Sequence, residues 1–146
     1  MKNLLIAIDF CDHIDHILDK AHELASALSA KVWLVHVANP TPDFISFEIG
    51  PQVVRDQQAH LLKQDHKHLV KIHDRFTKAG LETTAIMIEG PTVEKIIEYA
   101  NKSHADMIIM GTHGSGQLHK LLVGSISEGV LKKSHLPVLL IPTKPI

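Results

Sequence analysis

Several features that would by themselves indicate a class of protein are scarce or absent in this sequence. Its one cysteine, Cys11, cannot form a disulfide within the chain, which predicts a reducing compartment, the cytoplasm. Aromatic residues make up 4% of the chain, so a core has to be built from aliphatic side chains. No apolar run approaches the roughly 20 residues of a membrane span, and acidic residues from Asp9 onward interrupt the apolar start too early for a signal peptide. We therefore expect a cytoplasmic protein with no membrane partner.

A strong charge of one sign is also missing. The 15 Lys and Arg residues nearly balance the 16 Asp and Glu residues, for a formal net charge of -1. Proteins that bind nucleic acid usually carry a basic surface, so we expect no nucleic-acid partner. The 146 residues, 45% of them hydrophobic, fit a single domain over residues 1–146 whose core needs no disulfide.

What the sequence does contain is an alternation of two patterns. Short apolar runs are typical of buried parallel strands, and between them apolar residues recur at the spacing of amphipathic helices. The expected strands cover residues 4–8, 31–37, 83–88, 107–110 and 137–142, and the expected helices cover 14–28, 52–78, 92–100 and 125–134. This alternation predicts an α/β fold: a doubly wound, five-stranded parallel sheet of order 3-2-1-4-5 with helices on both faces.

Certain residues indicate where these helices begin or end. Asp12 or Asp15 can cap the first helix, and Asp9, at the end of the first strand, is an alternative cap. Gly80 follows the longest helix and is expected as its left-handed cap. Ser125 precedes the apolar period of the last helix and is the expected N-cap there.

A glycine-rich stretch follows the fourth strand directly. Gly111, Gly114 and Gly116 can adopt positive φ and let a ligand approach the main chain closely. Gly124 and Ser125 then open the last helix, where free amides lie at the positive end of the helix dipole. Two such groups of amides suit phosphate oxygens. The alternative is that these glycines only provide turns, which is common whatever the function.

The topology predicts which strand end faces this stretch. In a doubly wound sheet, ligands bind outside the carboxyl ends of the strands, where the strand order reverses. With the order 3-2-1-4-5, Asp9 and Gly111 should face each other across one crevice. Two better-known phosphate motifs are absent, because no glycine directly follows the first strand and no G-x-x-x-x-G-K-[ST] occurs.

The spacing of the glycines resembles a known pattern. Two residues separate Gly111 from Gly114, nine separate Gly114 from Gly124, and Ser125 follows, which gives G-x-x-G-x9-G-[ST]. This spacing is similar to the nucleotide-binding motif of the universal stress protein family, and nearly the whole chain resembles that family's ATP-binding branch. The resemblance implies a Rossmann-like fold of the adenine nucleotide alpha hydrolase-like type.

The resemblance also implies a ligand, ATP with the divalent ion Mg²⁺, and the residues that bind it. The residues at matching positions are Ala7, Asp9, Val37, Met110, Gly111, Thr112, His113, Gly114, Gly124, Ser125 and Ile126. By the same resemblance, Asp9 would lie near the ribose or the metal. Ala7 and Val37 would flank the adenine, and the residues around Gly124 would bind phosphates. A homodimer through the last strand, residues 137–142, is implied as well, and an apolar edge strand needs cover in any case.

These features favour a regulatory protein of the stress response that acts through ATP-dependent conformation and partner binding. Two alternatives stay open. A slow ATPase is one, with Asp9 and His113 as the candidates for a general base. A dimeric scaffold that binds no nucleotide is the other.

The 12 histidines and the single thiol raise two further hypotheses. His66 and His73 share a helix face, yet no histidine pair has a clear third ligand at the spacing that zinc sites use, so a polar helix face is the expectation. Cys11 lies near a helix start, which can lower a thiol pKa, but lone cysteines are more often inert than reactive.

Overall fold

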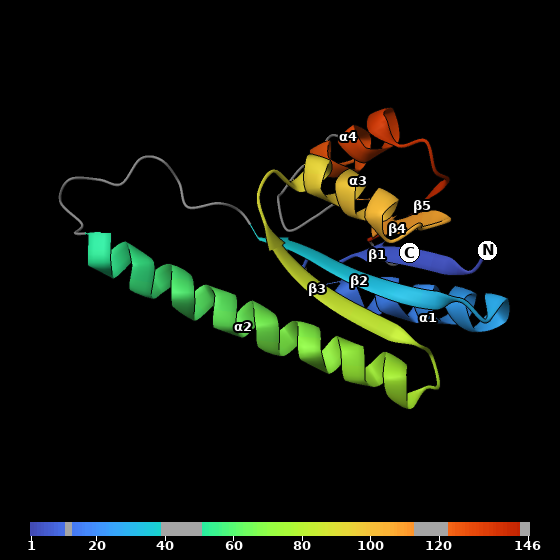
Figure 1. Ribbon diagram of the computed structural model, residues 1–146, viewed down its shortest axis with the longest axis horizontal. Coiled ribbons are helices and arrows are strands. Elements are labelled where there is room, and N and C mark those ends of the chain that lie inside the picture. Colours follow the sequence, from blue (N-terminus) through green and yellow to red (C-terminus); the bar gives the residue numbers. More distant parts are fainter. Residues whose placement is uncertain (11–12, 39–50, 113–122, 144–146) are drawn as a thin grey trace.

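The computed structural model describes residues 1–10, 13–38, 51–112 and 123–143, with residues 51–59 described as backbone only. Strands and helices alternate along the chain, as predicted (Figure 1). The strands are β1 (Asn3–Ala7), β2 (Lys31–Ala38), β3 (Thr83–Glu89), β4 (Met107–Gly111) and β5 (Val138–Ile141), and the helices are α1 (Ile14–Leu28), α2 (Pro51–Lys78), α3 (Thr92–Lys102) and α4 (Ser125–Lys133).

The strands form one parallel sheet in the order β3-β2-β1-β4-β5, which confirms the predicted topology. β1 lies at its centre, where Ile6 is paired with Leu34 of β2 on one side and with Ile109 of β4 on the other. In Figure 1, α1 and α2 cover one face of the sheet, and α3 and α4 cover the other. The strand order therefore reverses between β1 and β4.

The core has two layers because side chains alternate between the faces of a strand. Leu4 and Ile6 of β1 pack on the α1 and α2 side, with Phe76 of α2. Leu5, between them in sequence, packs on the α3 and α4 side, with Val130 of α4. All five side chains are fully buried. Phe76 is the one aromatic residue among the largest fully buried side chains of the described chain, as the shortage of aromatics predicts.

Helix α2 is the longest element, with 28 residues, and in Figure 1 its amino-terminal part extends beyond the sheet. It ends at Lys78, and Gly80, two residues further on, has a φ of 89°, which confirms the predicted left-handed cap. The Leu81 N–H then donates to the Phe76 carbonyl at 3.1 Å, which closes the last turn. Within the described parts of the chain, neither α2 nor any other helix combines the length and apolar character needed to cross a membrane.

The helix starts differ from the sequence predictions. The N-cap of α1 is His13, so Asp9 lies four residues before it and Asp15 lies inside the first turn; Asp12 falls outside the described residues. The N-cap of α4 is Gly124, with φ -70° and ψ 164°, and Ser125 is already helical. Both capping predictions were wrong, because the backbone geometry decides where a helix starts: His13 has φ -107° and ψ 20° before α1, and Gly124 is extended before α4. In α4, the Gly124 N–H is bonded to the Thr112 carbonyl outside the helix.

Candidate functional site

The carboxyl ends of β1 and β4 lie side by side at one edge of the sheet. Their register pairs Ile6 with Ile109, and one residue further along each strand stand Ala7 and Met110. Asp9 leaves β1 at this edge with an exposed side chain. The topology therefore brings Gly111, the first glycine of the motif, and the strand end that precedes Asp9 to the same edge, at the point where the strand order reverses.

Thr112, directly after β4, joins the two ends of the glycine-rich segment. Its N–H donates to the Ile141 carbonyl of β5 at 3.0 Å, and its own carbonyl accepts from the Gly124 N–H at 2.6 Å. Its hydroxyl oxygen accepts a third hydrogen bond from the Thr143 N–H at 3.3 Å. The chain thus leaves β4 at Thr112 and returns to the same point at Gly124. His113 and Gly114, which the motif also contains, lie outside the described residues.

Ser127 holds the start of α4 against the end of β4, a role that the sequence did not reveal. Its hydroxyl donates to the Gly111 carbonyl at 2.8 Å and approaches the Thr112 carbonyl at 3.3 Å, and the residue is 2% exposed. Each carbonyl belongs to a residue at the carboxyl end of β4. In the sequence, Ser127 is marked only as a second serine two positions after Ser125. The fold is needed to show which carbonyls its hydroxyl bonds.

The first turn of α4 presents backbone amides beside this junction. The first hydrogen bond within the helix runs from the Glu128 N–H to the Gly124 carbonyl at 2.9 Å. The amides of Ser125, Ile126 and Ser127 come before it and therefore have no carbonyl of the same helix to bond. No side chain of the described residues caps this helix. Such amides, at the positive end of the helix dipole, can bind an anion.

Val37 and Met110, the apolar members of the predicted site, are buried. Val37 is 9% exposed and Met110 is 5% exposed, and both belong to the cluster under α3 and α4. Ala7 is half-buried and packs against the same cluster. These residues come from three neighbouring strands, β2, β1 and β4, and pack together near the carboxyl ends of those strands.

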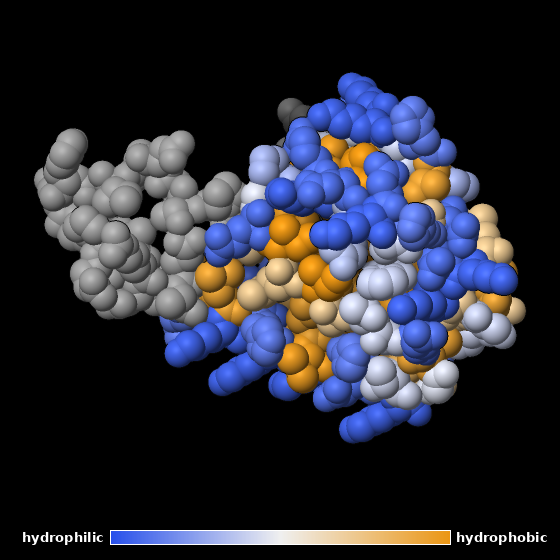
Figure 2. All heavy atoms as spheres, viewed as in Figure 1, coloured by the Kyte–Doolittle hydropathy of each residue, from blue (hydrophilic) through white to orange (hydrophobic). Residues whose placement is uncertain are grey.

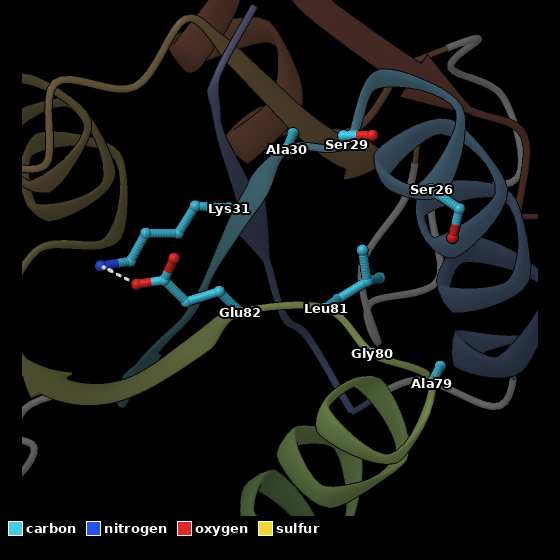
Figure 3. A pocket seen from close by; sticks show the side chains of 8 residues that line it. All are labelled: Ser26, Ser29, Ala30, Lys31, Ala79, Gly80, Leu81 and Glu82. Atoms are coloured by element: carbon cyan, nitrogen blue, oxygen red, sulfur yellow. Dashed lines mark ion pairs between the residues drawn. The ribbon is translucent and has the colours of Figure 1, made fainter.

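A hollow lies at the opposite end of the strands, between the carboxyl ends of α1 and α2 (Figure 3). Lys31 and Glu82 form an ion pair across its mouth, with Nζ and Oε1 3.3 Å apart. The Ser29 and Gly80 amides in its wall bond carbonyls of the preceding helical turns. The ion pair and these amides are thus already bonded within the protein. The hollow also lies at the amino ends of β2 and β3, away from the carboxyl ends where sheets of this type bind ligands.

The described residues contain no group of three or more His, Cys, Asp or Glu side chains that could hold a metal ion. The ring of His73, one of the two histidines predicted to share a helix face, forms a hydrogen bond with the main chain of the sheet. Its Nε2 donates to the Thr83 carbonyl of β3 at 3.1 Å. The expectation of a polar helix face therefore does not describe His73, which is half-buried against the sheet.

Comparison with known proteins gives one consistent family. The family model described as the universal stress protein family matches residues 1–142. Universal stress protein MJ0531 of Methanocaldococcus jannaschii is 29% identical over 146 aligned residues, which cover 96% of this chain and 81% of the relative. The solved structure of MJ0577, a universal stress protein of the same organism, has a TM-score of 0.84 at 26% identity and covers 99% of this chain and 98% of its own. A universal stress protein solved in complex with cAMP has a TM-score of 0.70 at 22% identity, with 98% of each chain covered, and so shares the fold.

Proposed function

Because the chain belongs to the universal stress protein family, we propose that it binds ATP with Mg²⁺ at the carboxyl edge of β1 and β4 and acts as a regulator through nucleotide-dependent conformation. The proposed setting is the stress response in the cytoplasm, in one domain over residues 1–146. The cAMP complex in the same fold supports an adenine nucleotide as the ligand class. The case for this chain rests on its own residues.

The observation that carries the proposal is the junction of β4 with α4. Ser127 and Thr112 hold the first turn of α4 at the end of β4, so its amides are fixed where the phosphates would lie. Fixed amides bind an anion without the entropy cost of ordering them first. The Ser125 hydroxyl is exposed and can add one more donor. We assign the phosphates to Gly124, Ser125 and Ile126, together with His113 and Gly114 of the same motif.

The rest of the nucleotide is assigned to the strands beside this junction. Ala7, Val37 and Met110 supply apolar surface for the adenine and the ribose. Asp9 is placed to accept from ribose hydroxyls or to contact the metal. Mg²⁺ is commonly held by one or two carboxylates together with substrate phosphates. A single carboxylate such as Asp9 therefore fits an ion that arrives with the nucleotide rather than one in a cage of protein side chains.

Calorimetry with ATP and Mg²⁺ tests the proposal directly. We expect binding by the native chain and an affinity weaker by about 10- to 100-fold for Ser125→Ala, because a hydrogen bond to a charged group contributes about 1.5–3 kcal/mol. Ser26→Ala is the matched control, since Ser26 is an exposed helical serine at the opposite end of the strands. No heat with the native chain at high micromolar concentration would reject the function. Equal affinities for the two variants would reject the phosphate assignment.

We also propose that two copies associate through β5. This strand is an edge of the sheet, and Leu139 at its middle is 37% exposed. Leu131 on the adjacent α4 is 45% exposed. An apolar edge strand is a template for pairing with another chain, and a second copy offers the same edge.

A further inference from the structure

His36, near the end of β2, is bonded on both sides of its ring. It is 9% exposed. Its Nδ1 lies 2.9 Å from the Ile8 carbonyl, and because a carbonyl only accepts, Nδ1 is the donor. Its Nε2 lies 3.1 Å from Oδ2 of Asp65 on α2. One imidazole therefore connects the exit of β1 with the long helix.

Ring contacts strengthen the same connection. The Phe10 ring lies 4.5 Å from the His36 ring, centroid to centroid. It also lies 5.2 Å from the His68 ring of α2, centroid to centroid. The residue before Asp9 thus accepts a hydrogen bond from His36, and the residue after Asp9 contacts two imidazole rings. Both neighbours of the carboxylate assigned to the nucleotide depend on His36.

We propose that His36 is a positioning residue that holds Asp9 at the nucleotide edge and, through Asp65, couples this edge to α2; its effect on the ligand rests on the proposed function. The hydrogen bond to Ile8 fixes the backbone one residue before Asp9. Asp65 in turn fixes the ring, which leaves Nδ1 pointed at the carbonyl. A displacement of α2 at Asp65 would then move the His36 ring and, with it, the backbone next to Asp9.

The coupling has to act in both directions. If nucleotide at the carboxyl end of β1 and β4 favours one position of Asp9, it also favours the α2 position coupled to it, and any other change that favours this α2 position strengthens nucleotide binding in turn. α2 is suited to carry such a signal, because its amino-terminal part extends beyond the sheet (Figure 1). Asp65 lies 29 residues from His36 in sequence and is not among the residues assigned to the ligand.

Two conservative variants of His36 separate its hydrogen bond to Ile8 from its hydrogen bond to Asp65. In His36→Asn, the amide nitrogen can take the place of Nδ1 and keep the bond to the Ile8 carbonyl, while the bond to Asp65 is lost. In His36→Gln, the longer side chain can take the place of Nε2 and keep Asp65, while the bond to Ile8 is lost. Asp65→Ala removes the α2 side and leaves His36 intact. Asp74→Ala is the matched control, because Asp74 is another α2 carboxylate beside a histidine, His73, that bonds β3 instead.

Two measurements on the full chain decide the outcome: amide hydrogen exchange at Ile8, whose N–H bonds the Val35 carbonyl at 2.8 Å, and ATP affinity with Mg²⁺. A typical hydrogen bond contributes about 0.5–1.5 kcal/mol, so its loss changes an equilibrium about 2- to 10-fold. We expect His36→Gln to raise exchange at Ile8 and weaken ATP binding by such a factor, and His36→Asn to restore exchange toward the native value. Asp65→Ala should weaken ATP binding, and Asp74→Ala should not.

The failures can be told apart. Unchanged exchange at Ile8 in His36→Gln overturns the positioning of the β1 exit. Native ATP affinity in Asp65→Ala overturns the coupling to α2. If the native chain binds no ATP, the proposed function fails and so does the effect of His36 on a ligand, while the exchange rates still decide whether His36 holds the β1 exit.

Discussion

At the scale of single residues, Asp106 fixes the start of the central strand, β1, although it lies more than 100 residues away in the sequence. Its Oδ2 accepts from the Asn3 N–H at 2.9 Å and from the Lys2 N–H at 2.7 Å. These two bonds, that from Asn3 first, lower the pKa of the Asp106 carboxyl below its ordinary value. The ionised carboxylate is therefore more stable in the folded chain than in the unfolded chain.

This lowered pKa gives a prediction with a definite sign. A carboxyl whose pKa is lower in the folded state contributes stability above its unfolded pKa, about 4, and loses it as the pH falls through the folded pKa. Asp106→Asn should therefore lower the melting temperature at pH 7, and the difference from the native chain should shrink below about pH 4. Thermal unfolding followed by circular dichroism over this pH range measures it. A difference that stays constant down to pH 2 would contradict the prediction.

The residues also show what the sequence could and could not predict. Gly111 could be predicted at the end of β4, and Gly124 and Ser125 at the start of α4, because periodicity indicates where the strands and helices lie and their alternation indicates the order of the sheet. The partners of Ser127, His36 and Asp106 could not, because the bonds join residues 15 to 104 positions apart. His36 also has the sequence environment of an ordinary strand residue, and only the packing of α2 shows that it makes two hydrogen bonds.

At the scale of elements, α4 is held close to α3 by a glycine in its middle. A Cβ built on Gly129 would lie 2.8 Å from Cγ2 of Val93 on α3, closer than side chains normally approach. Val93 cannot turn aside easily, because a β-branched side chain in a helix has one strongly preferred rotamer. The missing side chain thus sets the distance between the two helices, and with it the position of the first turn of α4.

Gly129→Ala should therefore destabilise the chain, although alanine favours helix. Overpacking costs about 1–3 kcal/mol, and the better helix propensity returns about 1 kcal/mol, so we expect a net loss on the order of 1 kcal/mol. Adding Val93→Ala makes room for the new methyl, so the double variant should be more stable than the sum of the single changes predicts. Denaturant unfolding of the native chain, both single variants and the double variant measures this coupling. Additive effects would show that Val93 does not limit the approach of α4.

At the scale of the whole molecule, the two edge strands of the sheet, β3 and β5, differ in how far the rest of the chain covers them. The β3 edge is partly covered by α2, whose His73 donates to the Thr83 carbonyl. Figure 2 shows apolar side chains over this region among hydrophilic ones, and β3 residues from Thr83 to Ile88 are half-buried. At the β5 edge, Leu139 and the neighbouring Leu131 of α4 are both exposed. The β5 edge is therefore the better candidate for contact with a second copy.

Leu139→Lys tests this assignment. A charge on an edge strand opposes pairing with another strand, and two copies of it would face each other across a symmetric interface. We expect light scattering on the size-exclusion peak to give a dimer for the native chain and a monomer for Leu139→Lys. Val70→Lys is the matched control, because Val70 is 41% exposed and belongs to α2, a helix that lies far from β5 in Figure 1. It should stay dimeric, since a lysine outside the interface meets no second copy. A dimer that survives Leu139→Lys, or a native chain that is monomeric, would place the association elsewhere or remove it, while nucleotide binding within one copy would be unaffected.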